Sequence, residues 1–310
     1  MDKFDTRSED DMKIGIIGLG KMGYPLALQL KDRGHTPVAF NRSPEKVDNI
    51  KNEGVEGAYT LENLLSKLDI PRIVFMMIPA GEAVDSMIAS LSPLLSQGDI
   101  LIDGGNSHYK DTKKRYAIMK DQGIHYMDVG TSGGVDGARN GACMMVGGDR
   151  EAVAQVEKAL QDLCVENGYA HVGPSGSGHY VKMIHNGIEY GMMQAIGEGF
   201  EILSESEYDI DHQQVAKLWQ HGSVIRSWLM ELTENVFIQH DDQLKDIVGV
   251  VNASGEGLWT VEEALERKVP APAITASLFA RYRSQQADTF SGKLLAGLRF
   301  QFGGHKMETK

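Results

Sequence analysis

The sequence predicts an α/β fold in which an N-terminal, Rossmann-like, doubly wound sheet is followed by an all-α C-terminal domain. Over the first half of the chain, short apolar runs that end in glycine-rich turns alternate with amphipathic segments, which is typical of parallel strands with crossover helices. From residue 177 onward the hydrophobic period is helical throughout. We therefore expect an extension at 1–11, a sheet domain at 12–176, a helical domain at 177–298 and a C-terminal tail at 299–310.

Composition limits the functions that this chain of 310 residues can serve. The formal net charge of −12 argues against a general nucleic-acid binder, which needs a basic face. No apolar run reaches the ~20 residues that span a bilayer, so we expect no membrane segment. The cysteines, Cys143 and Cys164, have neither metal nor redox spacing, which favours reduced thiols in a cytoplasmic protein. We also see no cluster of metal ligands and predict no metal site.

The N-terminal segment 1–11 is acidic and polar, and it lacks the apolar core of a secretory signal. We expect this segment to be a disordered extension, with Met12 as an alternative initiator.

The first apolar run leads into the sequence GLGKMG, and a helix is expected from Tyr24 to Arg33. A glycine-rich turn between a strand and a helix is the arrangement that binds dinucleotides. Phosphates would lie at the helix N-terminus, where free N–H groups and the helix dipole favour anions. This context disfavours the alternative, an ordinary glycine-rich turn. The residues expected to contact a cofactor here are Gly18, Leu19, Gly20, Lys21, Met22 and Gly23.

The end of the second strand, Thr36–Asn41, bears on which dinucleotide binds. NAD sites usually carry Asp or Glu at this end, where the carboxylate binds the ribose hydroxyls. Here the chain has Asn41, Arg42 and Ser43, and a guanidinium in place of a carboxylate suits a 2′-phosphate. These residues therefore favour NADP over NAD. The alternative is a surface arginine without a role in binding.

Three further predicted strands end in turns that we expect to face a ligand, because doubly wound sheets bind ligands at the carboxyl ends of their strands. They are Arg72–Ile78 before Pro79 and Ala80, Asp99–Asp103 before Gly104–Ser107, and His125–Val129 before Gly130–Gly134. Plain loop chemistry explains either glycine-rich turn alone. Two such turns in one sheet favour a ligand-facing role.

The stretch Gly178–Tyr190 opens the helical half and carries the most chemistry. On a helix, Lys182, His185, Asn186 and Glu189 fall on one face, so an amine, an imidazole, an amide and a carboxyl project together. A solvated helix face is the alternative interpretation. The preceding dinucleotide motif favours a reactive face.

Two structural expectations accompany this helix. Val181, Ile184 and Ile188 would form a separate apolar stripe that packs against the domain. Further along the chain, Thr260 and Glu263 have the spacing of a capping box, which predicts a helix start at that position.

These motifs resemble those of the short-form decarboxylating 6-phosphogluconate dehydrogenases, within the β-hydroxyacid dehydrogenase superfamily. The resemblance extends from Lys13 to His305. Other members of the superfamily share the sheet domain and SGG but carry a Lys-x-x-Asn-Asn pattern on this helix. The motifs that carry the resemblance are GLGKMG at Gly18–Gly23, DGGNS at Asp103–Ser107, SGG at Ser132–Gly134, KMIHNGIEYG at Lys182–Gly191, GEGLW at Gly255–Trp259, FAR ending at Arg281 and RFQFGGH at Arg299–His305.

The resemblance implies oxidative decarboxylation of 6-phosphogluconate to ribulose 5-phosphate and carbon dioxide, with NADP or NAD as cofactor. Lys182 would be the general base at the carbon-3 hydroxyl, and Glu189 would be the general acid that protonates carbon 1 of the enediol after carbon dioxide departs. Pro79, Ala80 and Asn106 would line the cofactor. The residues that would hold the sugar acid are Asn106, Ser132, Gly133, Gly134, His185 and Asn186. Those that would bind its phosphate are Tyr190, Arg281, Arg299 and His305, the last two from a neighbouring subunit.

The resemblance also implies a homodimer or homotetramer, with the tail crossing between subunits. Two departures affect the phosphate site. Ser254 stands where the long enzymes have a phosphate-binding lysine, and 247–250 lacks an acidic residue usual in the family. We therefore expect the phosphate to depend on Arg281, Arg299 and His305.

The proposed base sets a chemical condition of its own. A lysine with an ordinary pKa of ~10.4 is a poor base, so desolvation or a nearby cation such as His185 must favour the neutral amine. Two other functions stay open from the sequence. One is a non-decarboxylating β-hydroxyacid dehydrogenase, and the other is a non-catalytic nicotinamide-binding sensor.

Overall fold

The computed structural model describes residues 11–253, 255–303, 306 and 308. The expected N-terminal extension lies outside the described residues except for Asp11, and so do Ser254 and His305. Within the described ranges, no helix is both long enough and apolar enough to cross a bilayer.

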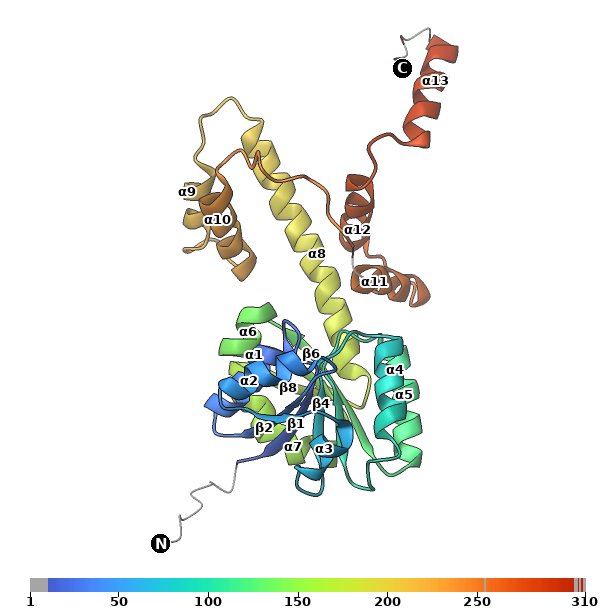
Figure 1. Cartoon of the computed structure of the whole chain (residues 1–310). Helices are drawn as coiled ribbons and strands as arrows, with labels where there is room; N and C mark the ends of the chain where they lie inside the picture. The colour runs from blue at the N-terminus through green and yellow to red at the C-terminus, as the bar shows by residue number, and fades with distance from the viewer. Residues whose placement is uncertain (1–10, 254, 304–305, 307, 309–310) are drawn as a thin grey trace. The chain divides into compact units, whose positions relative to one another are not determined.

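An eight-stranded sheet forms the N-terminal part of the chain (Figure 1). Its strands are β1 (Lys13–Ile17), β2 (Thr36–Phe40), β3 (Glu56–Ala58), β4 (Ile73–Met76), β5 (Ile100–Asp103), β6 (His125–Ser132), β7 (Ala142–Gly147) and β8 (Cys164–Gly173). Their order is β3-β2-β1-β4-β5-β6-β7-β8, and only the β6–β7 pair is antiparallel. The order reverses between β1 and β4, where doubly wound sheets bind their ligands. The predicted Rossmann-like sheet is confirmed.

Helices cover both faces of this sheet (Figure 1). They are α1 (Gly23–Asp32), α2 (Pro44–Asn52), α3 (Leu61–Ser66), α4 (Glu82–Leu91), α5 (Tyr109–Asp121), α6 (Gly134–Asn140) and α7 (Arg150–Asp162). Successive strand residues enter different cores, because side chains alternate across a sheet. Ile16 and Phe75 belong to the core beneath α1 and α7, whereas Ile17 and Met76 belong to the core beneath α3, α4 and α5. All four residues of β4 are buried, as its unbroken apolar sequence predicts.

The C-terminal part of the chain is helical, as predicted. Its helices are α8 (Ser177–Ser204), α9 (His212–Trp219), α10 (Trp228–His240), α11 (Gly255–Glu266), α12 (Pro272–Ser284) and α13 (Phe290–Gly303). The chain divides into two compact units within α8, between His185 and Asn186. The first residues of the expected tail, 299–303, continue α13.

The predicted helix start at Thr260 is wrong. α11 begins at Gly255, and the Thr260 hydroxyl donates to the Glu256 carbonyl at 2.9 Å, as threonine does inside a helix. Tertiary packing explains the earlier start, because the first turns of α11 lie against the ring of Tyr190 at Gly257.

The predicted turn at Gly130 is also wrong, because β6 continues to Ser132. Residues 128–132 pair with β7, and Ser132 lies opposite Cys143. A Cβ at Gly130 would lie 2.4 Å from the Cβ of Lys182. Glycine is therefore present here for the close approach of α8 to the strand rather than for a turn.

Candidate active site

The turn after β1 has a shape that fits a dinucleotide pyrophosphate. Gly18 has a φ of +101°, and a Cβ at Gly23 would lie 1.9 Å from the Gly18 carbonyl oxygen, so α1 can start against the turn only with glycine there. Among the described residues, no atom lies within 4 Å of the position a Gly20 Cβ would take. Backbone amides at the N-terminus of α1 are therefore accessible to an anion on that side.

Asn41 stabilises this turn from the end of β2. Its Oδ1 accepts a hydrogen bond from the Leu19 backbone N–H at 3.0 Å, and its Nδ2 donates to the Ser43 carbonyl at 3.3 Å. The amide thus connects two segments that were both expected to contact a cofactor, a contact that sequence interpretation did not anticipate. Arg42 and Ser43 are exposed beside it in the chain, so the guanidinium is accessible from solvent.

The loop after β5 holds Asn106 in an exposed position between buried anchors. The Asp103 carboxylate is 0% exposed and accepts hydrogen bonds from the Gly105 N–H at 3.1 Å, the Ser107 hydroxyl at 2.7 Å and the Tyr126 hydroxyl at 3.1 Å. Burial and the neighbouring Asp103 raise the pKa of Tyr126 well above its ordinary value, so the phenol stays a donor. Asn106 therefore projects from a fixed loop.

At the carboxyl end of β6, the structure brings together three of the predicted site residues. The Ser132 hydroxyl lies 3.2 Å from Nε2 of His185, and Nδ1 of His185 lies 3.5 Å from Nζ of Lys182. If Nδ1 accepts from the amine, Nε2 carries the imidazole proton and donates to Ser132. Gly133 has a φ of +118° and turns the chain from β6 into α6.

Two polar residues of α8 are buried, whereas two residues of its apolar stripe are exposed. Lys182 and Asn186 are each 8% exposed, whereas Val181 and Ile188 are 37% and 52% exposed. The expectation that the apolar stripe packs against the domain is therefore wrong for Val181 and Ile188, while Ile184 is half-buried. The close approach at Gly130 fixes which side of α8 faces β6, and that side carries Lys182.

In the second unit, Tyr190 and Arg281 lie together. The guanidinium carbon of Arg281 is 3.5 Å from the centroid of the Tyr190 ring, which is a close cation–π contact. Arg281 also donates to the Asn252 carbonyl at 3.2 Å. A Cβ at Gly257 would lie 2.3 Å from the Tyr190 ring, so α11 packs closely against that ring. The phenol and the guanidinium therefore form one preformed cluster.

The remaining predicted site residues have separate locations. Asn186 and the half-buried Glu189 lie on α8, and Arg299 is exposed on α13. Sequence interpretation missed Arg115 and Tyr126, whose side chains anchor the loop that carries Asn106. No sequence signal marks them, because their partners are distant in the chain.

Family models match nearly the whole chain. Residues 13–173 match the NAD-binding domain of 6-phosphogluconate dehydrogenase, and residues 178–306 match the C-terminal domain of the same enzyme. The chain belongs to the 6-phosphogluconate dehydrogenase family.

Individual members of this family are similar to nearly the whole chain. The Bacillus subtilis protein YqeC, whose name gives a 6-phosphogluconate dehydrogenase assignment as provisional, is 54% identical over 96% of this chain and 100% of its own. The NAD⁺-dependent decarboxylating 6-phosphogluconate dehydrogenase of Haloferax volcanii is 43% identical over 96% of this chain and 99% of its own. The solved 6-phosphogluconate dehydrogenase of Plasmodium falciparum is similar with a TM-score of 0.82 and 34% identity, over 96% of this chain and 66% of that chain.

Each of the two matched domains contains some of the predicted site residues. The NAD-binding domain contains the predicted cofactor contacts together with Ser132, and the C-terminal domain contains Lys182 and Glu189. A solved 3-hydroxyisobutyrate dehydrogenase of Mycobacterium tuberculosis shares the fold at 21% identity and a TM-score of 0.69.

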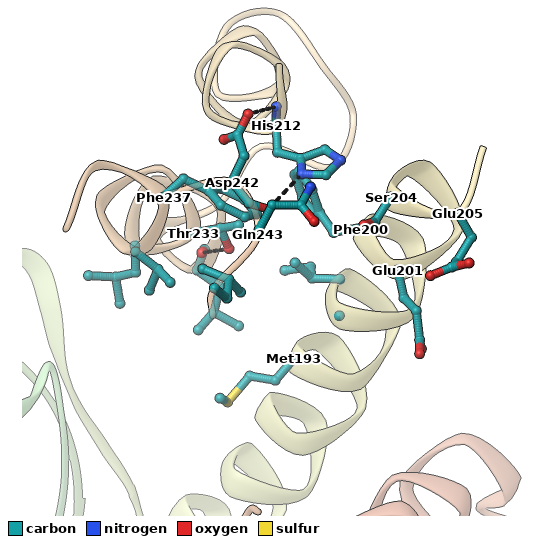
Figure 2. Close-up of a pocket in the computed structure, with 16 residues that line it drawn as sticks. Met193, Phe200, Glu201, Ser204, Glu205, His212, Thr233, Phe237, Asp242 and Gln243 are labelled. Atoms are coloured by element: carbon teal, nitrogen blue, oxygen red, sulfur yellow. Dashed lines mark hydrogen bonds between the residues drawn. The ribbon is translucent and has the colours of Figure 1, made fainter. Parts of the chain in front are cut away.

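The C-terminal domain also contains a groove (Figure 2). Its volume is about 480 Å³, and its walls come from α8, α9, α10 and the loop after α10. Apolar side chains such as Phe200 and Phe237 form much of the lining, with Glu201, Glu205 and Asp242 among them. Among the described residues that line the groove, none is a predicted catalytic, cofactor or substrate residue.

Proposed function

We propose that this protein oxidises and decarboxylates 6-phosphogluconate, giving ribulose 5-phosphate and carbon dioxide, with NADP or NAD as the hydride acceptor. The observation that carries the proposal is the series of contacts from Ser132 through His185 to Lys182, at the edge of the sheet where doubly wound folds bind ligands. Relatives named for this reaction support it.

The cofactor would lie against the turn Gly18–Gly23, with its pyrophosphate at the N-terminus of α1. When bound, the nicotinamide supplies the acceptor for the hydride that leaves carbon 3 of the substrate. Arg42 is exposed and would pair with a 2′-phosphate, so we propose NADP as the preferred cofactor. Asn106 would reach both cofactor and substrate from its anchored loop.

Lys182 would act as the general base. This role requires an uncharged amine, and burial is the environment that favours the uncharged form. The amine takes the proton of the carbon-3 hydroxyl as that carbon is oxidised. It then carries positive charge beside the new ketone and polarises it, which favours loss of carbon dioxide. Ser132 and His185 would hold the sugar acid against this amine.

Glu189 would act as the general acid. Carbon 1 of the 3-keto acid leaves as carbon dioxide, which gives the enediol of ribulose 5-phosphate. Carbon 1 of that enediol, which is carbon 2 of the substrate, must then receive a proton. Glu189 follows Lys182 by two turns of α8, so the proposed acid and base are carried by one helix. Asn186, between them in the chain, would bind a substrate hydroxyl.

The phosphate of the substrate would bind at Tyr190 and Arg281. Arginine binds phosphate bidentately, and the contact with the Tyr190 ring holds the guanidinium in place before a ligand arrives. Arg299 and His305 would complete the site from a neighbouring subunit.

The charge distribution of the C-terminal part supports self-association as a homodimer or homotetramer. Residues 186–250, which include the groove of Figure 2, contain twelve carboxylates and three Lys or Arg. Residues 267–306 contain seven Lys or Arg and one carboxylate. Complementary surfaces of this kind steer two copies of a chain together.

α13 is the segment that would occupy the groove of a second copy. Its apolar side chains Phe290, Leu294 and Leu298 recur every four residues, and they are 80%, 53% and 49% exposed. The charged residues of this helix are the cations Lys293 and Arg299, which complement the carboxylates of the groove. Occupation of the groove by α13 would also bring Arg299 to the neighbouring subunit.

Sedimentation velocity tests the self-association. Leu294→Glu should release the monomer, whereas Val224→Glu, at a position that is 98% exposed, should not. Glu201→Lys should weaken association, and adding Lys293→Glu should restore it. If the sedimentation coefficient of Leu294→Glu equals that of the wild type, α13 is not the occupant of the groove.

Turnover with 6-phosphogluconate tests the reaction. The purified protein is incubated with the sugar acid and either cofactor, and both reduced nicotinamide and released carbon dioxide are measured. We expect both products in equal amounts. Reduced nicotinamide without carbon dioxide would indicate the non-decarboxylating alternative. The absence of reduction with either cofactor would reject the proposed function.

A further inference from the structure

The guanidinium of Arg115 is buried in the sheet domain and contacts two separate loops. Arg115 lies on α5 and is 3% exposed. Its Nε donates to Asp85 at 2.7 Å, and its Nη2 donates to the Gly81 carbonyl at 3.1 Å. Its Nη1 donates to the Ser107 hydroxyl at 3.3 Å and lies 3.6 Å from the Asp103 carboxylate. One side chain thus connects the start of α4 to the end of β5.

The loops that this guanidinium connects follow adjacent parallel strands. The loop 77–81 follows β4, and the loop Gly104–Ser107 follows β5. The first loop exposes Pro79 and Ala80, and the second exposes Asn106. The carboxyl ends of parallel strands carry the ligand contacts of a doubly wound sheet. The guanidinium is therefore attached to two loops whose exposed residues would contact cofactor or substrate.

The two loops also touch each other, so their positions are coupled. A Cβ at Gly105 would lie 2.8 Å from the Ile78 carbonyl oxygen, so the two backbones approach closely at this position. The side chain of Asp103, at the base of the second loop, is 0% exposed and needs a positive partner. The planar fork of an arginine directs five N–H donors from three separate nitrogens, whereas the three donors of a lysine share one nitrogen and cannot reach the same widely spaced partners.

We propose that Arg115 is a positioning residue, which holds the loops after β4 and β5 in the arrangement that binds cofactor and sugar acid. The inference rests on the proposed function for its ligands. Arg115 itself would contact neither ligand. It acts by keeping Asn106 and the Pro79–Ala80 segment in fixed positions relative to each other.

A second arginine in the same sheet provides an internal comparison. Arg72 pairs with Asp99 at 3.1 Å, and the carboxylate of Asp99 is likewise 0% exposed. These residues precede β4 and β5, so the pair lies at the amino ends of the same two strands. A purely structural role for Arg115 would make the two arginines equivalent in their effect on catalysis.

The experiment compares Arg115→Lys with Arg72→Lys in the full chain. Both variants should lower the thermal midpoint. Arg115→Lys should lower kcat/KM for 6-phosphogluconate by ~10–100-fold, because small displacements of positioning groups cost that much. Arg72→Lys should leave kcat/KM within about threefold of the wild type, since its loop faces away from the ligands. Equal kcat/KM values for the two variants would overturn the proposal.

If Arg115→Lys does not fold, a milder pair of variants tests the same proposal. Asp85→Asn removes one charged partner of Arg115, and the Asp85 side chain is 61% exposed. Glu82→Gln makes the matching change at the other acidic residue in the first turn of α4. Asp85→Asn should raise the Kd for NADP several-fold, and Glu82→Gln should not. Equal Kd values for the two variants would contradict the proposal.

Amide hydrogen exchange separates this inference from the proposed function. Arg115→Lys should speed amide exchange in 77–81 and 104–107 more than at the amino ends of β4 and β5. This effect does not depend on which substrate the enzyme uses. Unchanged exchange in both loops would reject the positioning role. If the loops exchange faster but 6-phosphogluconate is not turned over, the proposed substrate is rejected and the positioning role of Arg115 stands.

Discussion

The Ser132 hydroxyl lies 3.2 Å from Nε2 of His185, which connects the carboxyl end of β6 to the helix that carries Lys182. This contact crosses 53 residues of sequence. It orients an imidazole whose other nitrogen lies 3.5 Å from the proposed base. The strand thereby contacts the face of α8 that is proposed to be reactive.

Ser132→Ala should raise the KM for 6-phosphogluconate by ~2–10-fold, because a hydrogen bond of this type contributes about 0.5–1.5 kcal/mol. The variant loses both a proposed substrate contact and the orientation of His185. Steady-state kinetics measure the effect, and Ser90→Ala, at an exposed helix position, is the control. A KM equal to that of the wild type would contradict the assignment of Ser132.

Lys182→Met should reduce kcat to less than about a tenth of the wild-type value at saturating substrate, because the reaction loses its base. Glu189→Gln should slow the reaction by ~10²–10⁴-fold, the usual contribution of a general acid. Both variants should keep the cofactor Kd of the wild type in a fluorescence titration. Lys217→Met, at an exposed position on α9, is the control. Retention of full kcat by Lys182→Met would remove lysine from the mechanism.

Arg42→Ala should lower kcat/KM for NADP by ~10–100-fold, because it removes a charged hydrogen-bonding partner worth about 1.5–3 kcal/mol. The value for NAD should change little, since NAD lacks the 2′-phosphate. Kinetics with both cofactors check this expectation, and Arg33→Ala provides a second exposed arginine for comparison. A wild-type preference for NAD that persists in Arg42→Ala would reject the role of Arg42.

Gly257→Ala should destabilise the protein by about 1–3 kcal/mol, the usual cost of overpacking. The new Cβ would lie 2.3 Å from the Tyr190 ring, so the ring must move, and the KM for 6-phosphogluconate should rise as Arg281 moves with it. Gly199→Ala on α8 is the matched control, because no described atom lies within 4 Å of its Cβ position. That variant should gain about 0.5–1 kcal/mol from the helix propensity of alanine. Chemical denaturation distinguishes the two outcomes.

The two cysteines should differ in reactivity toward a thiol reagent at mildly alkaline pH. Cys143 is exposed, whereas burial, together with the neighbouring Cys143, raises the pKa of the Cys164 thiol to about 12. Because the thiolate is the reactive form, mass spectrometry should find the adduct on Cys143. Labelling of Cys164 at the same rate in the folded protein would contradict its burial.

The raised pKa of Cys164 also predicts the sign of a pH effect on stability. The folded state binds this proton more tightly than the unfolded state, whose cysteine pKa is about 8.5. The stabilisation that Cys164 gives to the folded state is therefore fully present below the cysteine pKa of the unfolded chain. It is lost as the pH rises toward the pKa of Cys164 in the folded protein. Cys164→Ala should reduce the alkaline fall in the denaturation midpoint relative to the wild type.

Most of the fold was predictable because its signals are local. The unbroken apolar run of β4 and the glycine spacing of the turn after β1 each depend on neighbouring residues alone. The error at Thr260 has the opposite cause. A capping-box pattern was present, but packing of Gly257 on Tyr190 moved the helix start to Gly255.

The candidate site was predictable in part. The spacing of Lys182, His185 and Glu189 along α8 follows from helix geometry, so their common helix was expected from the sequence. Which side of that helix is buried was not predictable from hydrophobicity. The apolar Val181 and Ile188 are exposed, whereas Lys182 on the same helix is buried where α8 approaches Gly130 of β6.

The sequence by itself determined the sheet domain, the dinucleotide turn and the identity of the residues along the reactive helix, because periodicity and motif spacing act over a few residues. Only the tertiary structure decided that Arg115 contacts the loops after β4 and β5, that Asn41 holds the dinucleotide turn, and that β6 runs on beneath Lys182. These contacts join residues that are far apart in the chain. They depend on how closely two backbones approach, and no local pattern of residue types encodes that distance.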